Sequence, residues 1–406
     1  MKFRTHRKGY STERNRWGTI MIYLDNAATT KMSGAVLEKM MPYLTENYGN
    51  PAALYLPGSL AKKAVSESRR TIAKTLGVLP EEIFFTSGGS ESDNWALTGA
   101  ALSLKEKGRH IITTRIEHHA VLNTCKALEK QGFHVTYLPV DDRGRVDARQ
   151  LLSVLRSDTI LISVMAANNE VGTIQSLREI GEIAGKAGVL FHTDAVQMYG
   201  HLPIPVREWG IDLLSASGHK FHGPKGTGFL YIRKGVKIAP LIYGGGQESG
   251  NRAGTENVAG IAGLGEAARI ACEKMEENRL RMKKLRDYLE ERLLSEIPGC
   301  LVNGGGAERL PGTLSVCIPF VEGESVLIQL DMKGICASGG SACTIGSREP
   351  SHVLTAMGRS ALEAKGSLRF TVSEENTMEE MDETADAVRE IVEKLREMVG
   401  YRGQNG

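Results

Sequence analysis

The sequence predicts an α/β protein, with a mainly parallel mixed sheet in a large domain and a smaller α+β domain. Short apolar segments alternate with helical segments over residues 83–193, and this alternation is typical of βαβ units with helices on both faces of a sheet. Polar clusters follow four of the predicted strands, at the edge where such sheets bind ligands. Beyond residue 260 the predicted elements are fewer and more local, which indicates the smaller domain.

The large domain is expected at 21–260, with its first residues partly joining the small domain. Its strands are short, apolar and bounded by turn residues, and its helices show amphipathic spacing, the second being closed by Gly77. We expect strands at 22–24, 83–86, 110–114, 134–140, 159–166, 189–193, 212–216 and 228–233. We expect helices at 34–47, 60–76, 120–130, 148–155 and 177–187, and another that ends near 104.

The small domain is expected at 261–406 and is reached through a long helical region at 257–297 with an apolar stripe. Thr377 and Glu380 form a capping-box sequence, which predicts the start of a last helix. The remaining elements predicted here are a helix at 325–332 and strands at 313–319, 335–337 and 367–372.

Composition excludes several classes of protein. The 406 residues carry a net charge of +2, but residues 1–20 hold six basic side chains against one acidic one, so the body is neutral or faintly acidic and gives no electrostatic case for nucleic acid. We interpret 1–20 as a disordered or mis-started leader with Met21 as an alternative start, and a transit peptide stays open. No apolar run reaches the ~20 residues of a membrane span. Six scattered cysteines without a CxxC pair indicate a reducing cytoplasm rather than a disulfide scaffold.

The polar clusters suit pyridoxal phosphate (PLP), a cofactor that needs an amine, an acid at its ring nitrogen and donors for its phosphate. Lys220 follows the strand predicted at 212–216 and can supply the amine. Asp194 can hold the ring nitrogen, Gln197 can reach the ring oxygen, and His118 can stack on the ring. A glycine turn between strand and helix predicts an anion site, and the candidate phosphate ligands are Gly89, Ser90, Ser217 and His219. The alternatives are a surface lysine and ordinary core or surface histidines.

A metal site is not expected, because the His219-x-x-His222 pair lacks a suitably spaced third ligand. Cys343 is the candidate nucleophile. It lies at 338–349, in a glycine-, serine- and threonine-rich stretch without apolar period, whereas Cys317 lies in the apolar run TLSVCIPF. This context predicts an exposed, mobile thiol for Cys343 and a buried structural one for Cys317. An ordinary surface thiol is the alternative for Cys343.

The stretches around these residues form a series of motifs: YLDNAATT (23–30), YGNP (48–51), FTSGGSESDN (85–94), EHHAVL (117–122), NNEVGTIQ (168–175), HTDAVQ (192–197), SGHKFHGPKG (217–226), GGGQESGNRAGT (244–255), SGGSACTIGSREPSHVL (338–354) and LRFT (368–371). Together these motifs resemble the cysteine desulfurases of the NifS/IscS type, which are fold-type I PLP enzymes of the class-V aminotransferase family. The resemblance extends from Tyr23 to about Thr371, and the motifs follow the order of the family.

The resemblance implies a role for each matching residue. Lys220 would bind PLP covalently, and Asp194, Gln197 and His118 would contact its ring. Thr255 would reach the phosphate from the other subunit of a homodimer, beside Gly89, Ser90, Ser217 and His219. The substrate carboxylate would be bound by Asn169 and Arg369, with help from Asn50, and Cys343 would attack the substrate sulfur.

The implied function is PLP-dependent removal of sulfur from L-cysteine, which gives L-alanine and a persulfide on Cys343. A sulfur-acceptor protein would take that sulfur for iron–sulfur cluster, thio-cofactor or tRNA biosynthesis, and which acceptor stays open. The alternatives are a selenocysteine lyase, another fold-type I PLP lyase or aminotransferase, and a non-catalytic partner protein. The chain departs from the family pattern at Ser90, which replaces a threonine, and at Tyr55, which replaces a histidine.

Overall fold

The large domain is built on a seven-stranded mixed sheet with the order β2-β8-β7-β6-β5-β3-β4. The computed structural model describes residues 21–339, 350–398 and 400, so the basic leader 1–20 lies outside the described residues. Neighbours from β7 to β4 pair in parallel, and β8 pairs antiparallel with β2 and β7. The strands are β2 (Ile83–Thr86), β3 (His110–Thr114), β4 (His134–Leu138), β5 (Thr159–Ser163), β6 (Leu190–Asp194), β7 (Leu213–Ser217) and β8 (Gly228–Ile232). The predicted α/β class is confirmed.

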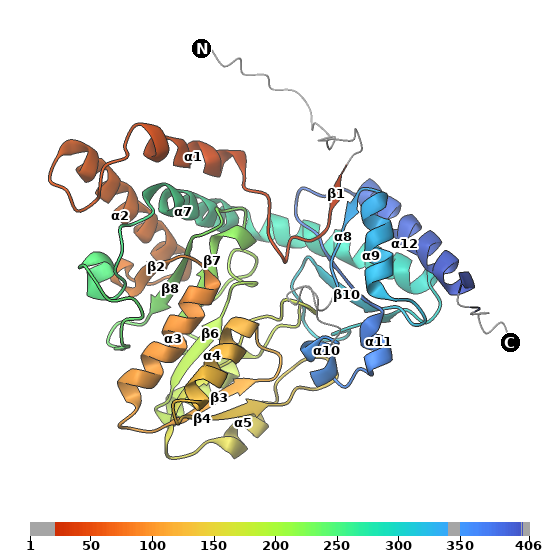
Figure 1. The fold of residues 1–406 in the computed structure, drawn as a ribbon, viewed down its shortest axis with the longest axis horizontal. Coiled ribbons are helices and arrows are strands. Elements are labelled where there is room, and N and C mark those ends of the chain that lie inside the picture. The colour runs from red at the N-terminus through yellow and green to blue at the C-terminus, as the bar shows by residue number, and fades with distance from the viewer. Residues whose placement is uncertain (1–20, 340–349, 399, 401–406) are drawn as a thin grey trace, which may run out of the picture.

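Helices cover both faces of this sheet (Figure 1). Leu213 and Leu214 are neighbours on β7 but belong to two different hydrophobic clusters, because successive side chains of a strand point to opposite faces. One cluster includes side chains of α2, α6 and α7, and the other includes side chains of α3 and α4. The helices are α1 (Gly34–Thr45), α2 (Leu56–Leu76), α3 (Gly89–Leu104), α4 (His119–Glu129), α5 (Ala148–Val154), α6 (Leu177–Ala187) and α7 (Val258–Glu273).

The small domain holds two short sheets and lies beside the large domain (Figure 1). An antiparallel sheet has the order β12-β10-β9, and β1 (Ile22–Tyr23) pairs in parallel with β11, Ile22 opposite Ile335. The helices and strands of the small domain after α7 are α8 (Met275–Glu296), β9 (Leu301–Val302), β10 (Thr313–Cys317), α9 (Gly323–Met332), β11 (Ile335–Cys336), α10 (His352–Ala356), α11 (Ala361–Lys365), β12 (Ser367–Thr371) and α12 (Met378–Met398). No helix of the described ranges is long and apolar enough to cross a membrane.

The helical region expected at 257–297 is two helices, α7 and α8, which meet at Lys274. Ile261 and Leu264 of α7 are buried in the large-domain core, whereas Met282 and Leu285 of α8 are buried in the small-domain core. The boundary expected at 260/261 therefore falls inside α7, and the packing places the change of domain at the α7–α8 junction.

Gly181 and Gly185 of α6 provide a test of how tightly this helix packs. A Cβ at Gly181 would lie 1.8 Å from the carbonyl oxygen of Trp209, whereas a Cβ at Gly185 would have no atom within 4 Å. We expect Gly181→Ala to lower the free energy of unfolding by about 3 kcal/mol through overpacking. Gly185→Ala, the matched control, should raise it by about 1 kcal/mol through helix propensity. Urea unfolding measures both changes, and similar values for the two variants would contradict the packing described.

Candidate active site

A cavity of about 250 Å³ lies at the carboxyl ends of β3, β5, β6 and β7 and at the start of α3. This is the sheet edge that the polar clusters predict. Nine residues singled out from the sequence line it: Gly89, Ser90, His118, Asn169, Asp194, Gln197, Ser217, His219 and Lys220. Asp93, Met165 and Val196 complete the lining.

Lys220 ends a short 3-10 turn, Gly218–Lys220, that directly follows β7. Its Nζ donates hydrogen bonds to the carbonyl oxygens of Ala27 at 2.6 Å and Ala28 at 2.8 Å. Both acceptors belong to residues 25–30, called here the 25–30 turn, which follows β1. The amine thus lines the cavity, and these two carbonyl oxygens help to orient it.

Asp194 and His118 form the charged centre of the cavity. The Asp194 carboxylate is buried and accepts a hydrogen bond from the Val196 backbone N–H at 2.9 Å. Burial raises the pKa of Asp194, while His118 and Lys220 favour its charged form. The Nδ1 of His118 accepts from the Ala120 N–H at 3.1 Å, so a neutral ring carries its proton on Nε2. Burial lowers the pKa of His118, Asp194 opposes this, and Lys220 adds to it.

Asp93, one turn after Ser90 on α3, is a site residue that the sequence analysis missed. It is fully buried, and its Oδ1 has no hydrogen-bond partner among the described residues. The Nε2 of His192 lies 3.6 Å from that oxygen. Burial first, and Asp194 second, raise the pKa of Asp93 well above the ordinary value. Two buried carboxyls that raise each other's pKa favour one charged and one protonated group, and Asp93, whose pKa is not lowered by His118 and Lys220 as that of Asp194 is, is the better candidate for the protonated one.

The start of α3 lines the cavity with Gly89 and Ser90, where the sequence predicts an anion site. Gly88 has a φ of +151°, which favours glycine, and has no side chain to cap the helix. A Cβ at Gly89 would lie 2.6 Å from Cγ2 of Val196, so glycine keeps the first helical N–H groups open to the cavity. Ser217 and His219 line the same cavity. Burial, with Lys220, lowers the pKa of His219 to about 4, so its ring is neutral at neutral pH.

Glu117, which precedes His118, is fully buried, and its Oε2 has no hydrogen-bond partner among the described residues. Its Oε1 accepts from Met165 N–H and Thr114 Oγ1, at 2.9 and 2.8 Å. Burial raises the pKa of Glu117 to about 8 although both hydrogen bonds lower it. The side chain is therefore protonated at neutral pH.

The raised pKa of Glu117 predicts a pH-dependent stability. Between about pH 4.5 and pH 8 the folded protein keeps a proton that the unfolded chain releases, so the free energy of unfolding falls as pH rises. In Glu117→Gln the free energy of unfolding should therefore decrease by about 4 kcal/mol less over this pH range than in the wild type. Urea unfolding of the cofactor-free protein at both ends of the range measures it. Glu106→Gln, an exposed control, should keep the full dependence, and an equal fall in both variants would contradict the assignment.

The remaining predicted residues do not line the cavity. Arg369 lies behind it, where Nη1 donates to the carbonyl oxygen of Asn169 at 2.8 Å. Asn50 is exposed and its Oδ1 accepts from the Ala52 N–H. Thr255 is exposed on the surface of this chain. Cys343 lies outside the described residues. Within the described ranges no three histidine, cysteine or acidic side chains are grouped so that they could hold a metal ion.

Both segments that flank residues 340–349 are attached beside the cavity. On one side Ser338 and Arg369 exchange backbone hydrogen bonds of 2.6 and 3.1 Å. On the other side Ser351 donates to the Glu170 carboxylate. The neighbouring His352 has its Nε2 3.0 Å from the carbonyl oxygen of Glu117. The described residues on either side of 340–349 thus contact Arg369, Glu170 and Glu117, which are bonded to or adjacent in the chain to the lining residues Asn169 and His118.

The chain is similar to known proteins over most of its length. The family model described as aminotransferase class-V matches residues 22–384. A "Cysteine desulfurase IscS" of Methanosarcina thermophila is 54% identical over 377 residues, 93% of each chain, and one of Dictyoglomus turgidum is 50% identical over 381 residues, 94% of this chain and 97% of its own. Among solved structures, a "NIFS-like protein" has a TM-score of 0.87 and 43% identity, and covers 92% of this chain and 100% of its own.

Another solved structure, "SspA in complex with cysteine", has a TM-score of 0.78 and 38% identity over 88% of this chain and 100% of its own. Family, relatives and fold neighbours agree over nearly the whole described chain, and the shared fold is that of fold-type I PLP enzymes. The chain therefore belongs to the aminotransferase class-V family, in the group of the NifS- and IscS-type cysteine desulfurases.

Proposed function

We propose that this protein is a PLP-dependent cysteine desulfurase that converts L-cysteine to L-alanine and keeps the sulfur as a persulfide on Cys343. The observation that carries the proposal is the single cavity in which the Lys220 amine, the buried Asp194 carboxylate and the open start of α3 meet. An amine, an acid and an anion site in one cavity are what PLP requires. The class-V family and its desulfurases depend on this cofactor.

The residues present fit the cofactor. Glycine at 89 allows α3 to approach Val196, whose Cγ2 a Cβ would meet at 2.6 Å, and the start of α3 with Ser90, Ser217 and His219 would hold the phosphate. Lys220 would bind the aldehyde carbon, Asp194 would pair with the ring nitrogen, Gln197 with the ring oxygen, and His118 would lie against the ring. When bound, PLP supplies an electron-withdrawing ring that stabilises negative charge on the substrate.

The chain's own residues then handle protons and the substrate. Lys220 would accept the Cα proton of the substrate, and the carbonyl oxygens of Ala27 and Ala28 would keep its amine in place. Neutral His118 carries a proton on Nε2 that it can donate. Asn169 would bind the substrate carboxylate with Arg369, which it already contacts. Asn50 lies away from the cavity in this chain, so its help would require a movement of its loop.

Cys343 is proposed as the nucleophile. Its thiolate would attack the substrate sulfur, so that an S–S bond forms and the Cβ–S bond breaks; Cβ then takes up one proton and Cα regains the proton that it lost, which gives alanine. One sulfur atom is transferred and no external oxidant or reductant is needed. The attachment of residues 338 and 351–352 beside the cavity supports this role. A later acceptor, an iron–sulfur scaffold or another carrier, would remove the sulfur in the cytoplasm.

A homodimer is proposed for this enzyme. Apolar side chains are exposed along one continuous segment from the end of α1 to the start of α2, namely Leu44, Tyr48, Leu54, Tyr55 and Leu56. Exposed apolar surface of this kind marks contact sites. In such a dimer the exposed Thr255 of each copy would reach the phosphate site of the other copy. Sedimentation at twice 44.1 kDa would support the dimer, and a monomer would contradict it.

The proposed function is tested by incubating the PLP-loaded protein with L-cysteine in the presence of a thiol that collects the sulfur. We expect alanine and sulfide in equal amounts, and a protein persulfide when the thiol is omitted. Selenocysteine is the comparison substrate. Activity with selenocysteine alone would replace the proposal by a selenocysteine lyase, and pyruvate or a keto acid as product would replace it by another PLP lyase or an aminotransferase.

A further inference from the structure

The 25–30 turn contacts the predicted cofactor residues from one short stretch of chain. The Ala27 carbonyl oxygen accepts from Lys220 Nζ at 2.6 Å and from Gln197 Nε2 at 3.0 Å. The Oγ1 of Thr29 lies 3.2 Å from Nδ1 of His219. The turn therefore holds the amine, the ring-oxygen ligand and a phosphate ligand, although none of its side chains lines the cavity.

Asp25, the first residue of the turn, binds the arginine expected to recognise substrate. Its Oδ1 accepts from Nη2 of Arg369 at 2.8 Å, and the arginine side chain is 4% exposed. The arginine's Nη1 donates to the Asn169 carbonyl oxygen at 2.8 Å. Its Nε is buried and has no hydrogen-bond partner among the described residues. A guanidinium has five N–H donors, so these two contacts fix its plane and leave donors for a further acceptor.

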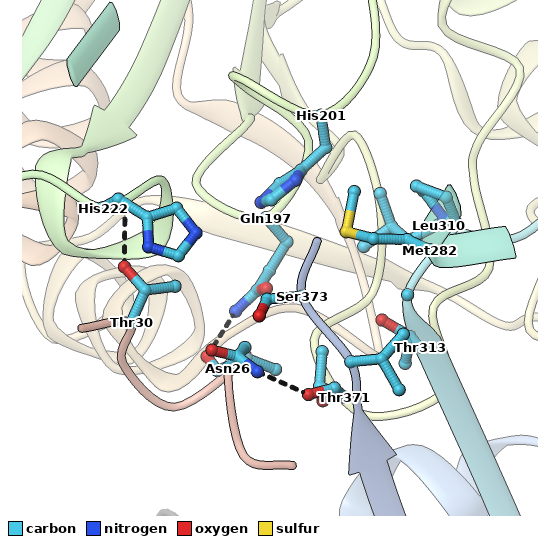
Figure 2. A pocket seen from close by; sticks show the side chains of 14 residues that line it. Asn26, Thr30, Gln197, His201, His222, Met282, Leu310, Thr313, Thr371 and Ser373 are labelled. Atoms are coloured by element: carbon cyan, nitrogen blue, oxygen red, sulfur yellow. Dashed lines mark hydrogen bonds between the residues drawn. The ribbon is translucent and has the colours of Figure 1, made fainter. Parts of the chain in front are cut away.

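The position of Asp25 is itself fixed by the small domain. Asp25 forms a β-bridge with Thr371, and the side-chain amide of Asn26 donates to the Thr371 carbonyl oxygen at 2.8 Å. Figure 2 shows this Asn26–Thr371 contact at a second pocket, which is different from the cavity described above. At the same pocket the backbone N–H of His222, from the large domain, donates to Oγ1 of Thr30 in the same turn. The turn is thus held from both domains, and the carboxylate of Asp25 is a rigid acceptor.

We propose that Asp25 is a positioning residue for the substrate carboxylate, because it fixes the guanidinium of Arg369 in the orientation that binds it. This inference rests on the proposed function, in which Arg369 and Asn169 recognise the substrate carboxylate. A buried arginine that has lost one of its two fixed contacts samples other orientations, and ordering it again on binding weakens affinity. Affinity should therefore decrease for ligands that carry a carboxylate and stay the same for ligands that lack one.

The test compares Asp25→Ala with Tyr23→Phe. Tyr23 donates from its hydroxyl to the carbonyl oxygens of Thr29 at 2.8 Å and of Asp25 at 3.2 Å, so its variant loosens the turn but keeps the Asp25 carboxylate that binds Arg369. We expect Asp25→Ala to raise KM for L-cysteine about tenfold and to leave KM for cysteamine, which lacks the carboxylate, unchanged. Tyr23→Phe should leave the ratio of the two KM values unchanged. Asp25→Asn, which preserves the shape, should give a smaller rise in the same direction.

Two further measurements do not depend on turnover. Binding of L-alanine, followed by the cofactor absorbance, should weaken about tenfold in Asp25→Ala, and binding of ethylamine should not change. In cofactor-free protein the loss of Tm in the Asp25→Ala, Arg369→Ala double variant should be smaller than the sum of the single losses. The alanine measurement decides the role of Asp25 even if the protein releases no sulfur from cysteine, which would refute the proposed function alone. Equal weakening of alanine and ethylamine, or none for either, would overturn the positioning role.

Discussion

Replacing Lys220 with alanine is expected to abolish covalent attachment of the cofactor and to lower the rate of sulfur release by about 10³-fold or more. Among the residues that the structure describes, Lys220 is the only lysine that lines the cavity, and its Nζ donates to the carbonyl oxygens of Ala27 and Ala28. Borohydride reduction followed by peptide mapping measures attachment directly. The expected result is label on the peptide with Lys220 in the wild type and no label in the variant.

Lys225→Ala is the matched control for this change. Lys225 lies five residues further along the same glycine-rich segment and is exposed. Its variant should be reduced and labelled at Lys220 like the wild type and should keep its rate. Label on another lysine of the Lys220→Ala protein would refute the covalent role of this amine.

Replacing Cys343 with serine is expected to separate cofactor binding from sulfur transfer. The variant should keep the visible absorption band of the bound cofactor, because the residues that line the described cavity are unchanged. Formation of persulfide and of alanine from cysteine should fall to the background rate, because a serine hydroxyl is a far weaker nucleophile toward sulfur than a thiolate. Mass spectrometry of the protein after exposure to cysteine detects the persulfide.

Cys336→Ser is the control for this second prediction. Cys336 lies on β11 in the same part of the chain and is partly exposed, but it does not line the cavity. We expect its persulfide yield to match that of the wild type. Normal sulfide production by Cys343→Ser, or a loss in both variants, would remove Cys343 from the mechanism.

Local sequence patterns predicted much of this structure because they depend on short-range physics. The capping box is confirmed: Thr377 N–H donates to Glu380 Oε2 at 3.1 Å and Glu380 N–H to Thr377 Oγ1 at 3.3 Å. Cys317 is buried, as its apolar context predicts. The polar clusters meet in one cavity because parallel strands bring their carboxyl ends to one edge.

Features that depend on long-range packing escaped the sequence analysis. In the sequence Asp93 is one polar residue of a predicted helix, and nothing in the local pattern indicates that it is buried. The fold places it beside His192, where it is buried. The elements α10, α11 and β9 are too short to show a period. The helix α2 begins at Leu56 rather than 60, because Pro57 in its first turn lacks an N–H that would need a partner. The contact of Lys220 with Ala27 joins residues far apart in the sequence.

The pairing of Ile22 with Ile335 has a consequence for the biosynthesis of this enzyme. On the ribosome the first strand emerges long before its partner, and a nascent chain folds its N-terminal parts first. Without β11 the 25–30 turn is held at its Thr30 end by His219 and His222 of the large domain but lacks the anchor that precedes Asp25, so the acceptors of the Lys220 amine are fully fixed only after residue 335 has been made. A chain that ends before β11 would carry Lys220 and α3 but would lack the β1–β11 pairing that fixes the 25–30 turn. We therefore expect prematurely terminated chains to bind PLP poorly.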